Sequence, residues 1–179
     1  MILFRSVPDE APFLRESGDE QPAGRWHRGG DGPVQYLADT PDGAWAEFLR
    51  HEEITDAQEL AGVTRTIWAV EIPEDPAPRS PSLDRATLTG ALDSYAACQA
   101  EAARLRAGGA TAIVAPSAAL RDGEARGWRV EDGIQPGRPR DGRVIVLFGA
   151  RQDLIAWRAS VDAQPDPALL AKVRHFRRR

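Results

Sequence analysis

The first two thirds of the chain contain four well-separated residues whose side chains could bind or cleave a nucleotide: Arg25, Tyr36, Glu47 and Ser117. A carboxylate beneath a ribose stabilises the positive charge that develops as the glycosidic bond breaks, and it can hold the 2′-hydroxyl. Glu47 is the candidate for that role. An aromatic face beside a cationic nicotinamide ring adds a cation–π attraction of about 1–2 kcal/mol where water is excluded, and Tyr36 is the candidate for it. These residue types suit a pocket for a dinucleotide whose glycosidic bond is cut.

The remaining candidates would hold the dinucleotide in place. A guanidinium binds phosphate oxygens through a planar fork that lysine lacks, so Arg25, with Arg5 behind it, is the expected clamp for a pyrophosphate. Ser117 follows a predicted strand and is expected to hydrogen-bond the nicotinamide amide or a ribose. His51 lies one helical turn after Glu47, so we interpret it as a residue that orients the carboxylate rather than as a base.

Each candidate taken alone has a simpler interpretation. Glu47 and His51 would form a solvated ion pair worth a few tenths of a kcal/mol. Tyr36 would be a core or edge-strand aromatic, and Arg25 a surface charge with a packed stem. Ser117 would start a turn or cap it. The well-marked helix that directly follows the tyrosine strand favours the functional interpretation.

The elements that must position these residues begin near the N-terminus. Residues 1–6 are apolar enough for a first strand, so Arg5 would be a charge on a half-buried strand. Residues 24–27 and 33–38 are predicted to form a hairpin around a glycine-rich turn, which would bring Arg25 and Tyr36 together. Thr40-Pro41-Asp42 predicts a helix that runs to about residue 52, with a hydroxyl cap, proline at the first position and an acid in the first turn.

The rest of the chain interleaves helices and strands without a steady βαβ rhythm, which favours the α+β class in one domain over residues 1–179. Residues 73–82 are proline-rich and predict a surface loop, and 133–142 predict another loop. Residues 174–179 predict a basic, solvated tail. Helices are expected at 55–61, at 89–107 and from Asp166 onward, and strands at 64–72, 111–115, 127–131, 143–148 and 154–159.

Composition excludes several classes of protein. A hydrophobic share of 42% and a charged share of 28% are those of a globular chain, and no apolar run reaches the roughly 20 residues that span a bilayer. We therefore expect a cytoplasmic protein without a membrane segment. The net charge of −4 argues against nucleic acid as a partner. His27, His51 and Cys98 lack the spacing of metal ligands, so no metal is expected.

The order and spacing of these motifs resemble the RES-domain family. The matching segments are Gly24-Arg25-Trp26, Tyr36 in VQYLA, Glu47 and His51 in AEFLRH, and Pro116-Ser117 in VAPSA, with Arg5 in LFR near the start. The resemblance covers about the first 120 residues. Two departures stand out: His27 occupies a position where the family commonly has asparagine, and the family's late asparagine-proline-histidine segment has no counterpart in a chain without asparagine.

The resemblance implies an ADP-ribosyltransferase-like fold of mixed sheets with flanking helices, and a toxin that consumes NAD as its substrate. The implied reaction is cleavage of the nicotinamide–ribose bond by a glycohydrolase or a phosphorylase, with an Xre-like antitoxin as the inhibitory partner. Two other functions stay open: transfer of ADP-ribose onto a protein target, and a catalytically silent module that binds a nucleotide or a partner. The sequence leaves a monomer and a homo-oligomer equally open.

Overall fold

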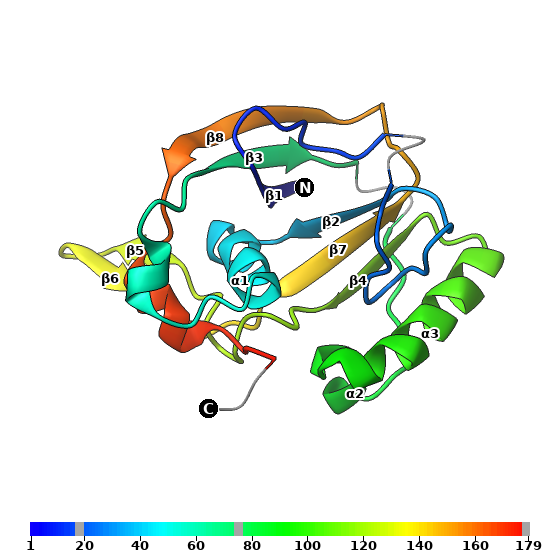
Figure 1. Cartoon of the computed structure of the whole chain (residues 1–179). Helices are drawn as coiled ribbons and strands as arrows, with labels where there is room; N and C mark the ends of the chain where they lie inside the picture. Colours follow the sequence, from blue (N-terminus) through cyan, green and yellow to red (C-terminus); the bar gives the residue numbers. More distant parts are fainter. Residues whose placement is uncertain (17–19, 74–76, 177–179) are drawn as a thin grey trace.

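The main sheet has six strands in the order β4-β7-β2-β1-β3-β8, and each neighbouring pair is antiparallel (Figure 1). A computed structural model describes residues 1–16, 20–73 and 77–176. The α+β class is confirmed. The strands of the main sheet are β1 (Ile2–Val7), β2 (Val34–Ala38), β3 (Arg65–Glu71), β4 (Ala112–Pro116), β7 (Arg143–Phe148) and β8 (Ile155–Ala163).

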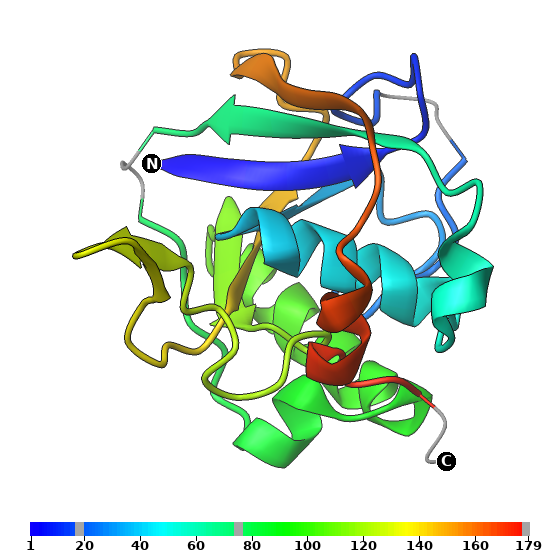
Figure 2. The same cartoon turned by 90° about the vertical axis from the view of Figure 1, so that its left-hand side faces the viewer.

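Helices α1 and α3 pack on the same face of this sheet, over different strands (Figures 1 and 2). α1 covers Phe4 of β1 and Ile67 of β3, and α3 covers the β4–β7 end through Cys98 and Ala102. The central strand β2 therefore runs beneath the space between the two helices. The helices are α1 (Pro41–His51), η1 (Ala57–Leu60), α2 (Arg85–Thr89), η2 (Leu92–Ser94), α3 (Tyr95–Ala107) and η3 (Pro167–Lys172).

The sheet opens between β1 and β2, which are in register only at Phe4 and Ala38. The gap is crossed by side chains: Arg5 of β1 donates from Nη1 to Oε1 of Gln35 on β2 at 2.9 Å. The same Gln35 oxygen accepts the backbone N–H of Arg15 at 2.8 Å, which ties the N-terminal loop to the sheet. This opening leaves room for a cavity beside the central strand.

The predicted start of α1 is confirmed in detail. Thr40 is the N-cap, and its hydroxyl accepts the backbone N–H of Gly43 at 2.9 Å. Pro41 is the first helical residue, where a missing N–H costs nothing. Trp45 and Leu49 are buried against the sheet. Glu47 lies on another side of the helix and faces the space above β2.

Three predicted elements were wrong. Residues 24–27 form a tight turn, closed by the Gly24–His27 bridge, because both edges of β2 are already paired with β1 and β7. Residues 89–107 do not form one helix, since Gly90 separates α2 from the turn that leads into α3. The predicted loop 133–142 contains a strand, β6 (Ile134–Pro136), which pairs with β5 (Trp128–Val130); β5 itself confirms the strand predicted at 127–131.

The two predicted surface segments differ in how far they contact the rest of the protein. In the loop at 73–82, residues 74–76 lie outside the described residues, whereas Arg79 joins Ile113 in a β-bridge. The C-terminal residues 174–176 are not a solvated tail, because Arg174 and Phe176 contact α1; residues 177–179 lie outside the described residues. Among the helices of the described residues, none is long and apolar enough to cross a bilayer.

Candidate functional site

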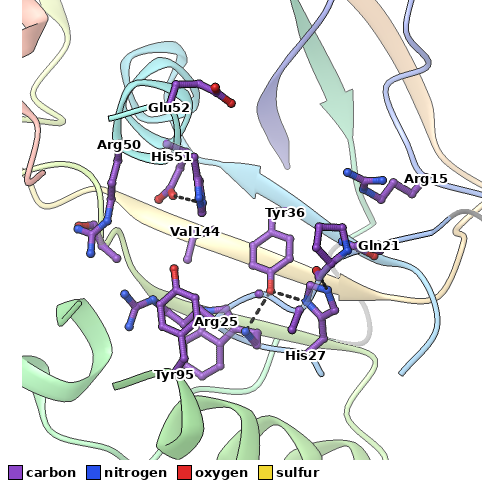
Figure 3. A pocket seen from close by; sticks show the side chains of 16 residues that line it. Arg15, Gln21, Arg25, His27, Tyr36, Arg50, His51, Glu52, Tyr95 and Val144 are labelled. Atoms are coloured by element: carbon purple, nitrogen blue, oxygen red, sulfur yellow. Dashed lines mark hydrogen bonds and ion pairs between the residues drawn. The ribbon is translucent and has the colours of Figure 1, made fainter. Parts of the chain in front are cut away.

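A cavity of about 400 Å³ lies between α1, the start of α3 and the turn at residues 24–27 (Figure 3). A second chamber of about 260 Å³ adjoins it, and Tyr36, Glu47 and His51 line both. We call these the main cavity and the side chamber. The main cavity is lined by Arg15, Gln21, Pro22, Ala23, Gly24, Arg25, Trp26, His27, Tyr36, Glu47, Arg50, His51, Glu52, Tyr95, Ala118 and Val144.

Glu47 presents its carboxylate to this space with few constraints. Its side chain is 29% exposed, and Oε2 lies 3.9 Å from Nε2 of His51 one turn later on α1. Oε1 accepts the hydroxyl of Ser117 at the long distance of 3.5 Å. The carboxylate is thus loosely oriented from two sides, and its oxygens remain available to a ligand.

Ser117 is buried and contacts Glu47, but it is not among the residues that line the main cavity. Its Oγ accepts the backbone N–H groups of Ala119 at 3.2 Å and Leu120 at 3.0 Å, which caps the turn after β4. These two bonds orient the hydroxyl so that its proton can point to Glu47. The structure therefore places Ser117 behind the carboxylate, outside the residues that line the main cavity and the side chamber.

Tyr36 is held by two hydrogen bonds at its hydroxyl. The oxygen accepts the backbone N–H of Trp26 at 3.0 Å, and it lies 2.9 Å from Nδ1 of His27. Nε2 of His27 is 2.9 Å from the carbonyl oxygen of Pro22, which only accepts, so Nε2 carries the ring proton. Nδ1 is then an acceptor, and the tyrosine hydroxyl donates to it.

Burial fixes the charge states of this pair. Burial lowers the pKa of His27 below its usual value, which keeps the imidazole neutral and matches the tautomer assigned from its contacts. Burial likewise raises the pKa of Tyr36 above its usual value, so its side chain is a neutral phenol. His27 therefore accepts a hydrogen bond from the Tyr36 hydroxyl and holds the ring in place.

Gly24 allows this arrangement because it has no side chain. A Cβ at this position would lie 2.7 Å from Cε1 of His27 and 2.9 Å from the hydroxyl oxygen of Tyr36. Both distances are shorter than normal contacts, and the two rings are held by hydrogen bonds. The glycine of the Gly24-Arg25-Trp26 segment is therefore required by close packing.

Arg25 lines the main cavity, but much of its guanidinium is turned into the protein. The residue is 7% exposed, and it donates to the carbonyl oxygen of Gly90 at 2.6 Å and to the hydroxyl of Ser94 at 2.8 Å. Its Cζ lies 4.7 Å from the centre of the Tyr95 ring. Arg25 thus fixes the segment between α2 and α3 that forms one wall.

Arg5 belongs to the side chamber rather than the main cavity. Burial, and then the charges of Arg15 and Arg65, lower its pKa to about 10. Arg15 and Arg65 line the same chamber. The carboxylates of Glu47 and Glu52 also line the chamber, so its three guanidinium groups are offset in part and the remaining excess of positive charge would attract an anion.

Arg50 is the main functional candidate that the sequence did not reveal. It lies on α1 three residues after Glu47, is 2% exposed, and donates from Nη2 to the carbonyl oxygen of Gly90 at 2.7 Å. Nη1 donates to the carbonyl oxygens of Ala118 and Arg174, the latter at 2.8 Å. Burial, and then repulsion by Arg25, lower its pKa to about 10, although Glu47 opposes the shift. The sequence signal that could have revealed Arg50 is its spacing of three residues from Glu47, which puts the two side chains near one another on the helix.

Arg15, Gln21 and Tyr95 also line the main cavity without having been predicted. Figure 3 shows Arg15 and Gln21 on one side of Tyr36, with Tyr95 and Arg25 grouped on another. Arg15 and Gln21 come from an irregular loop, where no periodicity marks the direction of a side chain. No group of three His, Cys, Asp or Glu side chains within the described residues is arranged to hold a metal ion.

A family model described as the RES domain matches residues 3–165. The chain belongs to the RES-domain family. Its fold is similar to that of a chain in the crystal structure of the M. tuberculosis MbcT-MbcA toxin-antitoxin complex, with a TM-score of 0.62. That match has 16% sequence identity and covers 95% of this chain and 86% of the other. The comparison with curated proteins gives no match.

Proposed function

We propose that this RES domain is a toxin-like enzyme that cleaves the nicotinamide–ribose bond of NAD. The observation that carries the proposal is the Glu47 carboxylate, which opens onto a cavity whose wall includes the Tyr36 ring. As the bond from C1′ to the pyridinium nitrogen breaks, its electron pair neutralises the nicotinamide ring and positive charge grows on the ribose. Glu47 stabilises that charge, and C1′ then bonds either to a phosphate oxygen or to a water oxygen, which releases one proton to solvent.

The remaining residues supply binding and orientation. The position of the Tyr36 ring is fixed, because its hydroxyl is hydrogen-bonded to Trp26 and His27, so the ring can serve as a surface for the nicotinamide. The main cavity and side chamber have volumes in the range of ligand pockets, which is about 300–1,000 Å³, when they are taken together. We place the diphosphate toward the side chamber, near Arg5 and Arg15. The terminal nitrogens of Arg25 already donate hydrogen bonds to Ser94 and Gly90.

An antitoxin partner is part of the proposal. The M. tuberculosis relative by fold is a toxin in complex with its antitoxin, and an active NAD-consuming enzyme would stop growth unless it were inhibited. We expect wild-type protein to arrest cells that express it alone. The Glu47→Gln variant should be tolerated, because it keeps the size of the side chain and removes the charge.

The decisive experiment incubates purified protein with NAD and measures free nicotinamide by chromatography. Glu47→Gln should reduce its release by about 100-fold or more, as expected when a charge that stabilises a transition state is removed. Glu131→Gln is the matched control, because Glu131 lies at the end of the β5–β6 hairpin, outside both chambers, and pairs with Arg129. Unchanged release from Glu47→Gln would exclude the mechanism.

The second product separates the related reactions. ADP-ribose indicates hydrolysis, and a phosphorylated ADP-ribose that appears only with added phosphate indicates phosphorolysis. Label from NAD that appears on a protein band indicates ADP-ribose transfer. Binding of NAD without nicotinamide release by the wild-type protein would identify a silent nucleotide-binding module and refute the proposal.

A further inference from the structure

A further cavity, of about 660 Å³, shares Arg50 with the main cavity. We call it the arginine cavity. It is formed by α1, the segment between α2 and α3, the turn after β4, and the C-terminal segment. The lining residues are Arg50, Thr55, Thr89, Gly90, Ala91, Arg121, Leu170, Ala171, Arg174, His175 and Phe176.

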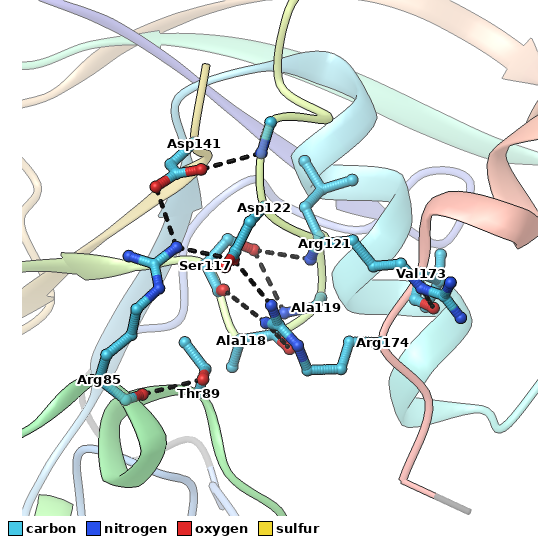
Figure 4. Close-up of polar contacts among 12 residues, drawn as sticks. Arg85, Thr89, Ser117, Ala118, Ala119, Arg121, Asp122, Asp141, Val173 and Arg174 are labelled. Carbon is cyan, nitrogen blue, oxygen red and sulfur yellow. Dashed lines mark hydrogen bonds and ion pairs between the residues drawn. The ribbon is translucent and has the colours of Figure 1, made fainter. Parts of the chain in front are cut away.

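The side chains that line the arginine cavity give it a positive charge. Three arginines and a histidine line the arginine cavity, and none of the described residues that line it is Asp or Glu. Arg174 is neutralised in part, since its Nη2 binds Asp122 at 2.9 Å, a carboxylate that also accepts Arg85 at 2.7 Å (Figure 4). Arg50 and Arg121 donate hydrogen bonds to backbone carbonyl oxygens instead.

Arg121 is the member best able to meet a ligand. Its side chain is exposed, and it makes a long hydrogen bond of 3.3 Å from Nε to the carbonyl oxygen of Val173 (Figure 4). This contact anchors the inner end of the guanidinium and leaves the two terminal nitrogens for a second partner. Two parallel N–H donors on a planar group match the oxygens of a phosphate.

Arg50 is fixed in place at the boundary between the arginine cavity and the main cavity. Its Cζ lies 4.3 Å from the centre of the Phe176 ring, and its terminal nitrogens bind three backbone carbonyl groups. Burial lowers its pKa, and the charges of Arg25 and Arg174 lower it further, against the opposing charge of Glu47. A second anion brought close to this buried cation from the arginine cavity would stabilise its charge.

We propose that the arginine cavity is a phosphate-binding site, with Arg121 and Arg174 at its outer side and Arg50 at its inner side. The ligand is a phosphate group, either as the free ion or as part of the dinucleotide that the main cavity would hold. An anion bound here is coupled to the proposed catalytic cavity by contact, because Arg50 lines both.

The test uses the full chain as its Glu47→Gln variant, so that NAD turnover does not interfere. Inorganic phosphate and ADP-ribose are titrated by calorimetry at constant ionic strength, with chloride as the control ion. Arg121→Gln in this background should weaken binding about tenfold, because it removes one charged pair of donors. Arg129→Gln is the matched control, since it removes the same charge from the β5–β6 hairpin, where Arg129 pairs with Glu131.

The two sources of phosphate give different results. If free phosphate is the ligand, Arg121→Gln weakens phosphate binding only, and ADP-ribose binds with phosphate already present. If the dinucleotide supplies the group, Arg121→Gln weakens ADP-ribose binding and the two ligands compete. Equal binding of both ligands to Arg121→Gln and Arg129→Gln, including no binding to either, overturns the proposal.

Two further measurements keep this result separate from other failures. Arg121→Lys, in the same Glu47→Gln background, retains the charge but not the fork, so it should bind phosphate more weakly than the parent protein; undiminished binding overturns the assignment of the fork. Thermal unfolding confirms that each variant folds. If the wild-type protein releases no nicotinamide and Arg121-dependent binding persists, the proposed enzymatic function fails while the phosphate site stands.

Discussion

Arg25 and Arg50 donate to the same atom, the carbonyl oxygen of Gly90, at 2.6 Å and 2.7 Å. The two cations come from different elements, the turn at residues 24–27 and helix α1, and they meet at the segment between α2 and α3. Like charges that approach each other repel, and the shared oxygen offsets part of that cost. The carbonyl of Gly90 therefore joins three parts of the cavity wall.

Arg50→Lys should destabilise the protein. Lysine keeps the charge, but it cannot reach Gly90, Ala118 and Arg174 at once or stack its head on Phe176 as a planar group. The expected loss is about 2–3 kcal/mol in the free energy of unfolding, measured by urea denaturation. Arg104→Lys is the control, because Arg104 is largely exposed on α3 and pairs with Glu101. A loss no larger than the control's would show that the three carbonyl contacts contribute little.

Gly90→Ala should distort the same junction. The added Cβ would lie 2.9 Å from the backbone oxygen of Ala86 and 3.0 Å from the Ser94 side chain. We expect a loss of about 1–3 kcal/mol in stability, as for other overpacked sites, together with weaker ADP-ribose binding. The matched control is Gly29→Ala, since a Cβ there meets nothing within 4 Å. If both variants melt at the same temperature, the junction tolerates the methyl group.

His27→Asn, which introduces the family's common residue, should change the pH dependence of stability. The pKa of His27 is lowered in the folded protein, so the unfolded chain binds the proton more tightly. Stability from this histidine is then complete above its ordinary pKa of about 6.5 and declines as the pH falls below it. The wild-type free energy of unfolding, minus that of the variant, should therefore fall between pH 7.5 and pH 5. A difference that is independent of pH would contradict a neutral buried imidazole.

Ser117→Ala should affect stability more clearly than chemistry. The variant removes the cap that accepts two backbone N–H groups, at a cost of about 1 kcal/mol. Glu47 loses only a long contact of 3.5 Å, so nicotinamide release should fall by less than about tenfold, in kcat rather than KM. Ser117→Thr keeps the hydroxyl, so it should restore the hydrogen bonds to the two backbone N–H groups. A loss as large as that of Glu47→Gln would mean that Ser117 contacts the substrate itself.

The sequence by itself determined the parts of this protein that depend on local signals. The Thr40 cap, Pro41 and the apolar spacing of α1 predicted that helix, and the strand predicted at 143–148 is β7 with the same bounds. The spacing of Glu47 and His51 along one helix face placed both at the same cavity. These features follow from contacts between residues at most a few positions apart, which sequence spacing specifies directly.

Only the tertiary structure decided how the distant residues meet. The predicted hairpin failed because β2 is paired on both edges, and Tyr36 reaches the 24–27 turn through its hydroxyl instead. Arg25 binds residues about seventy positions later, and Arg50 binds carbonyl groups from three separate segments. Which carbonyl a guanidinium meets depends on how whole elements pack, and no local propensity encodes that choice.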